Sequence, residues 1–262
     1  MILSHPARRA VVGVLLAATA VCVAACGGET AGSAVPVSAF DRTAPDTSAP
    51  PADQLTAAMT STVMSGPYRV STESGGVRSE GQIDAARRIV LWEEFSGGAA
   101  APDQSLLLRD DAALVRFSTA VNGAEAGTWY RMADTEESRR TLSVLFDVDA
   151  ITSLVDTAIG VEVKGSGDVD GSRTTHFVVT PDPKAVVDLA MRLLPSATQD
   201  LDASELKDLE EKAPEELHYW VNRDGYLVRE DDGFRVKTYR AFGVPLRLPA
   251  VDASAAPVLA GS

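Results

Sequence analysis

Apolar and polar residues alternate through most of the chain after residue 67. For example, Ala113, Val115 and Phe117 share one face of a predicted strand, while Arg116 and Ser118 share the other. A period of two is typical of a half-buried β-strand. Runs of this kind, separated by Gly-Gly, Asp-Asp, Asp-Gly and Asn-Gly pairs, predict about eleven strands. They cover residues 68–73, 77–84, 88–95, 105–109, 113–119, 128–132, 161–164, 174–180, 217–222, 226–229 and 234–239.

Apolar residues three or four positions apart, preceded by capping residues, predict four or five helices. The first is expected to end at Gly66-Pro67. Two more lie in the middle of the chain, where an apolar stripe runs through residues 142–159. The expected N-cap residues are Asp53, Asp134, Asp149 and Asp182, and a further charged helix is expected to begin at about Ala203.

The short connections between predicted strands determine the fold class. Nearly all are too short for a parallel crossover, so the sheet is expected to be antiparallel. A long antiparallel sheet must curl or split, and helices can then cover one side of it. We therefore predict an α+β fold: a strongly curved, half-barrel sheet whose concave face is plugged by the middle helices. The strand at 88–95 is apolar on both faces in its first half, so we expect it to be covered on both sides.

The N-terminus has the layout of an export signal. Arg8 and Arg9 precede an apolar run of about 15 residues, which is shorter than the roughly 20 residues of a membrane-spanning helix. Small residues then lead directly into Cys26, as in the bacterial lipobox, in which the cysteine is diacylated and becomes the new N-terminus. Residues 1–25 are therefore predicted to be a lipoprotein signal peptide and Cys26 the lipid attachment site, on the extracytoplasmic face of the cell membrane. The alternative is an ordinary secretory peptide with an incidental cysteine.

Composition then divides the remaining chain. Residues 26–52, rich in Gly, Ser, Thr, Ala and Pro, are predicted to be a disordered tether. Residues 53–247 form the expected domain, and residues 248–262 a flexible tail. Without Arg8 and Arg9, 22 of the 24 Lys and Arg remain against 37 Asp and Glu, a formal net charge of −15. A surface this acidic repels polyphosphates, which argues against nucleic-acid binding.

Cysteine chemistry is excluded from the domain itself. Cys22 lies in the leader, and Cys26 is consumed by acylation. The domain therefore has no thiol for a disulfide, a zinc ligand or a nucleophile, and it must depend on its hydrophobic core. We expect no cofactor.

Other residues that could carry chemistry are better explained as structural. His176 and His218 lie on separate predicted strands, and we expect them to be structural residues on the helix-covered face. No Gly-x-Ser-x-Gly motif occurs, and the Ser204-x-x-Lys207 spacing reads as a helix cap plus a solvated lysine. Two adjacent acidic pairs place their members on opposite faces of a strand, so neither forms a catalytic dyad: Glu93-Glu94 and Asp231-Asp232.

Three further features admit two explanations each. The Asp168-x-Asp-Gly sequence is better read as a hairpin turn than as a calcium loop, because it lacks the distal glutamate. The acidic stretch at 205–216 is better explained as a solvated helix face than as a partner-binding surface. The tryptophans either line a ligand cavity or belong to the core: Trp92, Trp129 and Trp220.

With these features in place, the chain resembles the actinobacterial lipoproteins of the LppX/LprG type, within the LolA-like superfamily. The lipobox, the first helix and the β-meander match in order. Two more specific matches are the run from Asp168 through Asp182-Pro183 and the closing hairpin from Trp220 to Arg229. The resemblance covers roughly residues 53–246. It implies a half-barrel sheet wrapped over helices and, in some members, a space between them that holds acyl chains of a glycolipid.

Two functions follow as hypotheses. The first is a membrane-anchored, non-catalytic binder or carrier of an acylated lipid or glycolipid, attached to the membrane through Cys26. The alternative is an envelope interaction or regulatory lipoprotein with a filled core and no lipid ligand. An enzyme is not expected, since no nucleophile–base pair or metal-binding constellation can be named in the sequence.

Overall fold

The computed structural model describes residues 46–109, 112–121, 123–132, 147–193, 198 and 201–259. The chain forms one eleven-stranded sheet in the order β6-β5-β4-β3-β2-β1-β11-β10-β9-β8-β7. Every pair of neighbouring strands in it is antiparallel. The predicted α+β fold with an antiparallel sheet is confirmed. The strands are β1 (Tyr68–Ser74), β2 (Val77–Asp84), β3 (Ile89–Ser96), β4 (Gln104–Arg109), β5 (Ala112–Phe117), β6 (Trp129–Arg131), β7 (Gly160–Val169), β8 (Ser172–Thr180), β9 (Leu217–Asn222), β10 (Leu227–Asp231) and β11 (Val236–Arg240).

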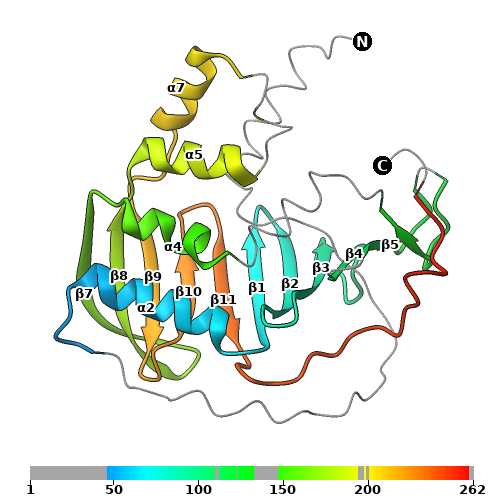
Figure 1. Ribbon diagram of the computed structural model, residues 1–262, viewed down its shortest axis with the longest axis horizontal. Coiled ribbons are helices and arrows are strands. Elements are labelled where there is room, and N and C mark those ends of the chain that lie inside the picture. Colours follow the sequence, from blue (N-terminus) through cyan, green and yellow to red (C-terminus); the bar gives the residue numbers. More distant parts are fainter. Residues whose placement is uncertain are drawn as a thin grey trace.

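The strand order divides the sheet into two up-and-down units. We call β1–β6 the N-terminal meander and β7–β11 the C-terminal meander. They join where β1 pairs with β11, from Arg69 opposite Arg240 to Glu73 opposite Val236. Strands β6 and β7 are at the two ends of the order, and Figure 1 shows the sheet running across the molecule between them.

Two of the described helices cover one face of the C-terminal meander, which we call the inner face. These are α2 (Pro51–Met64) and α4 (Val148–Asp156), drawn in front of the strands in Figure 1. Helices α5 (Pro183–Leu193) and α7 (Ala203–Glu211) lie beyond the strand ends. They form a small apolar cluster of their own around buried Val187 and Leu209. The opposite side of the sheet is the outer face.

Two predicted helix caps are wrong, Asp53 by three residues and Asp149 by two. Helix α2 begins at Pro51 after Pro50, and Asp53 lies in its first turn without capping it. A proline suits this position because it has no N–H group to leave unsatisfied. Helix α4 is capped by Asp147, whose side chain accepts from the backbone of Asp149 and the next residue. The predicted helix that starts at Asp134 lies mostly outside the described residues.

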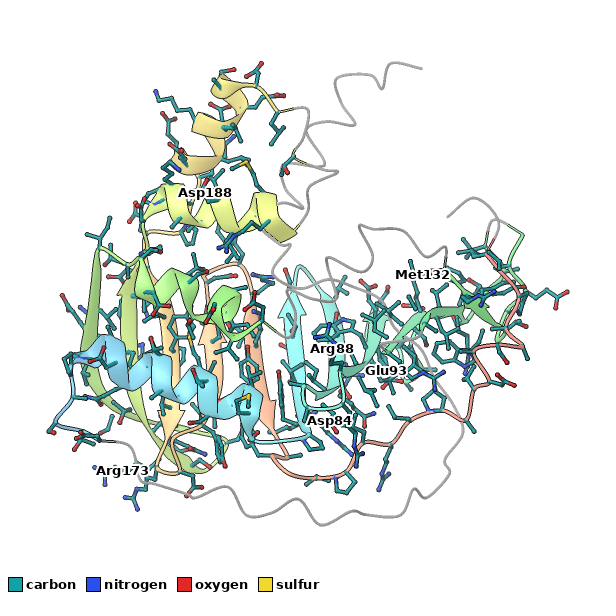
Figure 2. All side chains as sticks on the ribbon, in the orientation of Figure 1. Asp84, Arg88, Glu93, Met132, Arg173 and Asp188 are labelled. Carbon is teal, nitrogen blue, oxygen red and sulfur yellow. The ribbon has the colours of Figure 1, made fainter. Side chains whose placement is uncertain are left out.

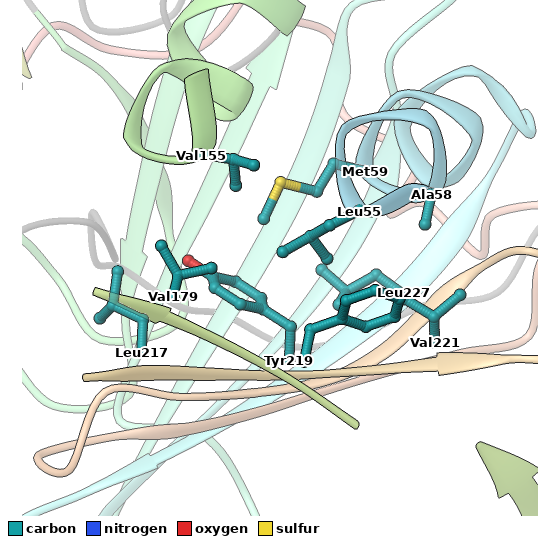
Figure 3. Close-up of a cluster of buried hydrophobic side chains, with 10 residues drawn as sticks. Leu55, Ala58, Met59, Val155, Val179, Leu217, Tyr219, Val221 and Leu227 are labelled. Atoms are coloured by element: carbon teal, nitrogen blue, oxygen red, sulfur yellow. The ribbon is translucent and has the colours of Figure 1, made fainter. Parts of the chain in front are cut away.

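The core of the C-terminal meander is filled by α2 and α4. Leu55, Ala58 and Met59 of α2 and Val155 of α4 pack on the inner face of β8–β10, as Figure 3 shows. The strand residues that complete this cluster are Phe177, Val179, Leu217, Tyr219, Val221 and Leu227. The expectation that the middle helices alone plug the sheet is corrected, since the first helix supplies three of the four buried helical side chains.

The C-terminal segment is not the flexible tail that we expected. Leu248, Val251 and Ala253 pack on the outer face of the N-terminal meander, against buried side chains of β3–β5. Arg131 of β6 pairs in parallel with Val258. The segment is anchored because it covers apolar side chains that would otherwise face water. It covers the outer face of the first half of β3, one of the two sides that we expected to be covered.

Several predictions fall on residues that the structure does not describe. The signal peptide, Cys26 and the tether up to residue 45 lie outside the described residues. Within the described part, none of the helices is both long enough and apolar enough to cross a membrane.

Candidate functional site: the inner face of the N-terminal meander

The inner face of the N-terminal meander presents apolar side chains in ordered rows. Strand register aligns residues that face the same way on neighbouring strands. The first row runs through Tyr239, Val70, Gly81, Trp92, Leu106 and Val115. The second row runs through Tyr68, Ile83, Val90, Leu108 and Ala113. Together they make an apolar wall that spans β1–β5.

The partners of this wall differ from those of the neighbouring core. The apolar cluster around buried Val70, Trp92 and Leu106 contains, among the described residues, only strand side chains and Met132. The cluster on the C-terminal meander includes side chains from α2 and α4. Figure 2 labels Met132 in the half of the sheet that these helices leave uncovered. Tyr239 packs against both clusters, so it lies at their boundary.

Gly81 determines how the largest side chain of the wall lies. A Cβ at this position would come within 2.5 Å of the Trp92 ring and within 2.7 Å of a Val70 methyl group. The indole therefore lies directly against the backbone of β2, a close approach that a side chain at position 81 would prevent. Trp92 is the tryptophan that contributes to the wall.

A third row, nearer the hairpin turns, is polar. It consists of six residues on six adjacent strands, and we call it the tip row: Glu230, Lys237, Thr72, Ser79, Glu94 and Gln104. Each lies two positions along its strand from the first apolar row or its β10 counterpart, so the rows are about 7 Å apart. The inner face of this meander is therefore amphipathic along the strand direction.

One part of the tip row is a charged network. The Glu230 carboxylate lies 2.8 Å from Nζ of Lys237 and accepts from the Tyr239 hydroxyl at 2.9 Å. Lys237 and Glu230 side chains are only 12% and 17% exposed. Burial and the nearby Glu230 carboxylate raise the pKa of Tyr239, which keeps its hydroxyl protonated as a donor.

The two acidic residues of β3 separate as predicted. Glu94 belongs to the inner tip row, and its pKa is raised by burial and by the nearby Asp103 carboxylate. Glu93 lies on the outer face opposite Glu80 of β2. Burial, and then the Glu80 carboxylate, raise the pKa of Glu93 to about 7, with Arg116 acting in the opposite direction. The pair does not form a dyad.

The histidines are not where we expected them. His176 and His218 lie on the outer face of β8 and β9, alternating with buried residues of the inner core. The structure brings them together, with His176 Nε2 3.1 Å from His218 Nδ1. One nitrogen must donate and the other accept. Burial, and then the charge of His218, lower the pKa of His176.

The surroundings of this pair are aromatic and cationic. Trp220 stacks on His176 with ring centroids 4.5 Å apart, and the Arg229 guanidinium lies 4.8 Å from the Trp220 ring. The Glu216 carboxylate is 3.6 Å from His218 Nε2. Across the described ranges, no group of three or more His, Cys, Asp or Glu side chains is arranged to hold a metal ion.

The remaining sequence candidates have local structural roles. Asp168 accepts from the Gly171 backbone at 2.8 Å, which makes this segment the predicted hairpin turn. In α7, Lys207 pairs with Glu211 on the helix surface, with both side chains more than 60% exposed. Trp129 packs in the outer cluster that the C-terminal segment covers.

A separate pocket of about 920 Å³ lies at the hairpin ends of the sheet. Its walls include Glu73, Arg78 and Phe95 of the outer face, and the exposed Phe234 of the β10–β11 turn. The Arg78 guanidinium lies 4.3 Å from the Phe95 ring. Charged residues and glycines make up about half of the lining, and the strand side chains named above lie on the outer face, so the pocket does not continue the apolar rows of the inner face.

The fold is similar to that of solved structures. LprF from Mycobacterium bovis is 14% identical, with a TM-score of 0.50, over 79% of this chain and 98% of that one. The Mycobacterium tuberculosis lipoprotein LppX is 14% identical, with a TM-score of 0.47, over 74% and 98%. No family model matches the sequence, and no curated protein does. The chain has the fold of LprF. The antiparallel α+β fold expected from the resemblance is thereby confirmed at the level of architecture.

Proposed function

We propose that this chain is a membrane-anchored, non-catalytic binder of an acylated lipid, held on the inner face of the N-terminal meander. The observation that carries the proposal is the contrast between two adjoining surfaces. The C-terminal meander has its inner face filled by Leu55, Met59 and other helical side chains. The wall around Trp92 and Leu106 is as apolar, but no described helix contributes to its cluster.

The energetics suit an acyl chain. Each CH₂ group moved from water to an apolar surface gains about 0.8 kcal/mol, so a long chain in contact with two apolar rows offsets most of its loss of bilayer contacts. Val70, Val90 and Leu106 of the wall are between 3% and 5% exposed, so a bound chain has to displace the contacts that now cover them. The fold shared with LprF supports the proposal only at the level of architecture.

The anchor is proposed from the sequence. We infer that Cys26 is acylated, that residues 1–25 are removed, and that the domain is tethered at the extracytoplasmic face of the cell membrane. The acidic mature surface would keep the domain from adsorbing to anionic headgroups. Metabolic labelling with an alkyne fatty acid tests this, because Cys26→Ser should abolish labelling. Cys22→Ser is the matched control and should remain labelled.

The ligand proposal is tested by native mass spectrometry of protein purified from its own host. We expect co-purified lipid. Leu106→Gln, which introduces an amide into the wall, should lower the lipid content, whereas Ser71→Gln on the outer face of β1 should not. Repeated absence of lipid from the unmodified protein would contradict the proposal. It would favour an envelope interaction protein with a filled core.

A further inference from the structure

The tip row combines unused hydrogen-bonding capacity with burial. The Thr72 side chain is only 4% exposed, and its hydroxyl has no hydrogen-bond partner among the described residues. Such a group is costly to bury, and buried hydroxyls are normally paired. Thr72 lies on the inner face beside Val70, two positions along β1. The unpaired hydroxyl is therefore next to the apolar wall.

A cationic donor lies directly opposite this hydroxyl. Lys237 of β11 is the register partner of Thr72, and side chains of such pairs have Cβ atoms about 5 Å apart. An ammonium group has three N–H donors, and of the described residues only Glu230 is in contact with that of Lys237. Ser79, on the other side of Thr72, adds a second hydroxyl to the row.

We propose that the tip row is a head-group subsite, in which Thr72, Lys237 and Ser79 bind the uncharged, hydroxyl-rich head of the acylated lipid. The inference depends on the proposed function, because it assumes that an acyl chain lies on the apolar wall. The rows are about 7 Å apart, so a head group joined to that chain reaches the tip row without leaving the sheet.

The charges of the row select for a neutral head. The row contains one cation, Lys237, and two carboxylic acids: Glu230 lies beside Lys237, and Glu94 lies beside Ser79. Lys237, the neighbour of Thr72, is already paired with the Glu230 carboxylate at 2.8 Å, so this ion pair has no net charge with which to attract a phosphate. Sugar hydroxyls both donate and accept, so they can satisfy the threonine hydroxyl, the ammonium group and a carboxylate together.

The test compares two probes with the same chain, hexadecyl glucoside and hexadecyl phosphate, binding to the delipidated domain. The intrinsic fluorescence of Trp92 and its neighbours, or calorimetry, reports the affinity. The unmodified protein should bind the glucoside about tenfold more tightly than the phosphate, as expected for a few additional hydrogen bonds. Thr72→Val, which keeps the shape but removes the hydroxyl, should weaken glucoside binding about threefold to tenfold.

Thr238→Val is the matched control, since Thr238 lies on the outer face of β11 opposite Ser71. It should leave both affinities unchanged. Thr72→Val should also fold at least as well as the unmodified protein, because it removes an unpaired buried hydroxyl.

The outcomes separate the two proposals. Equal binding of both probes, or a Thr72→Val protein that binds the glucoside normally, would overturn the head-group subsite while leaving lipid binding intact. Failure of the unmodified protein to bind either probe would overturn both the subsite and the proposed function.

Discussion

The two meanders solve the same packing problem in different ways. Both present apolar side chains on the inner face of one continuous sheet. The C-terminal meander is completed by α2 and α4, whose side chains interlock with Phe177, Tyr219 and Leu227. The N-terminal meander has a wall of comparable size in which the described contacts all come from the sheet, together with Met132. The first arrangement is a core that helices complete, and the second is the surface on which we propose that the lipid binds.

On the outer face the contrast is reversed: among the described residues, it is the N-terminal meander that is covered. Leu91, Leu107 and Leu114 of the N-terminal meander are covered by the C-terminal segment. The C-terminal meander has His176, Trp220 and Arg229 on its outer face, and among the described residues no comparable apolar segment covers them. The N-terminal meander therefore gains its outer cover from the end of the chain. Among the described residues, no helix packs against its inner-face cluster.

The largest expected effect is a loss of stability in the C-terminal meander, whose inner face is filled by helices. Leu55 is fully buried between α2 and the C-terminal meander. Leu55→Ala should lower the free energy of unfolding by about 2–5 kcal/mol, measured by urea denaturation, because it leaves a cavity. Lipid affinity should not change. Met64→Ala at the end of the same helix, where the side chain is 50% exposed, should be within about 0.5 kcal/mol of the unmodified protein. Loss of lipid binding without destabilisation would mean that the two halves are not distinct.

A smaller effect on stability, with loss of binding, is expected at Gly81. The Cβ of Gly81→Val would overlap the Trp92 ring and Val70, so the indole must move. Overpacking of this kind costs about 1–3 kcal/mol, and the disturbed wall should bind lipid several-fold less tightly. Trp fluorescence and thermal unfolding measure both effects. Gly160→Val is the control, since a Cβ there meets no atom within 4 Å. Unchanged lipid affinity in Gly81→Val would exclude Trp92 from the site.

The C-terminal segment on the outer face should contribute less to stability. Leu248 is partly buried against the N-terminal meander. Leu248→Ala should cost about 1 kcal/mol, since it removes only partly buried methyl and methylene groups. Thermal unfolding measures this, with Val244→Ala, 45% exposed, as the control. If the two variants melt alike, the segment does not support the sheet.

The smallest effect concerns pH. The pKa of Glu93 is about 7 in the folded protein against an ordinary 4.5. The folded state therefore holds this proton more tightly, and its stabilising contribution is complete below pH 4.5 and is lost as the pH rises to about 7. Solvent screening of this half-exposed group limits the change to about 1 kcal/mol. Glu93→Gln should make the melting temperature depend less on pH between pH 4.5 and about 7. An unchanged pH profile in the variant would assign the titration to another group.

The sequence predicted the strands far better than the site. Hairpin connections and alternation located all eleven strands, because both signals are local. Cross-strand register is not local when helices intervene. The two strands that carry His176 and His218 are separated by α5 and α7, so nothing in the sequence indicated that the rings are in contact.

The tip row was missed for the same reason. Alternation alone places Thr72 on the face of Val70 and Glu94 on the face of Trp92. The pairing of β1 with β11 is needed to place Lys237 beside Thr72, and these residues are far apart along the chain. The covering role of residues 248–259 was hidden because their small apolar side chains lack any strand or helix period.

Photo-crosslinking with a diazirine-bearing fatty acid, followed by peptide mapping, tests the central claim most directly. The label should be saturable and should fall on inner-face residues of β1–β5, with Val70, Trp92 and Leu106 among them. Labelling confined to β8 and β9, or no saturable labelling at all, would contradict the claim that the N-terminal meander holds the lipid.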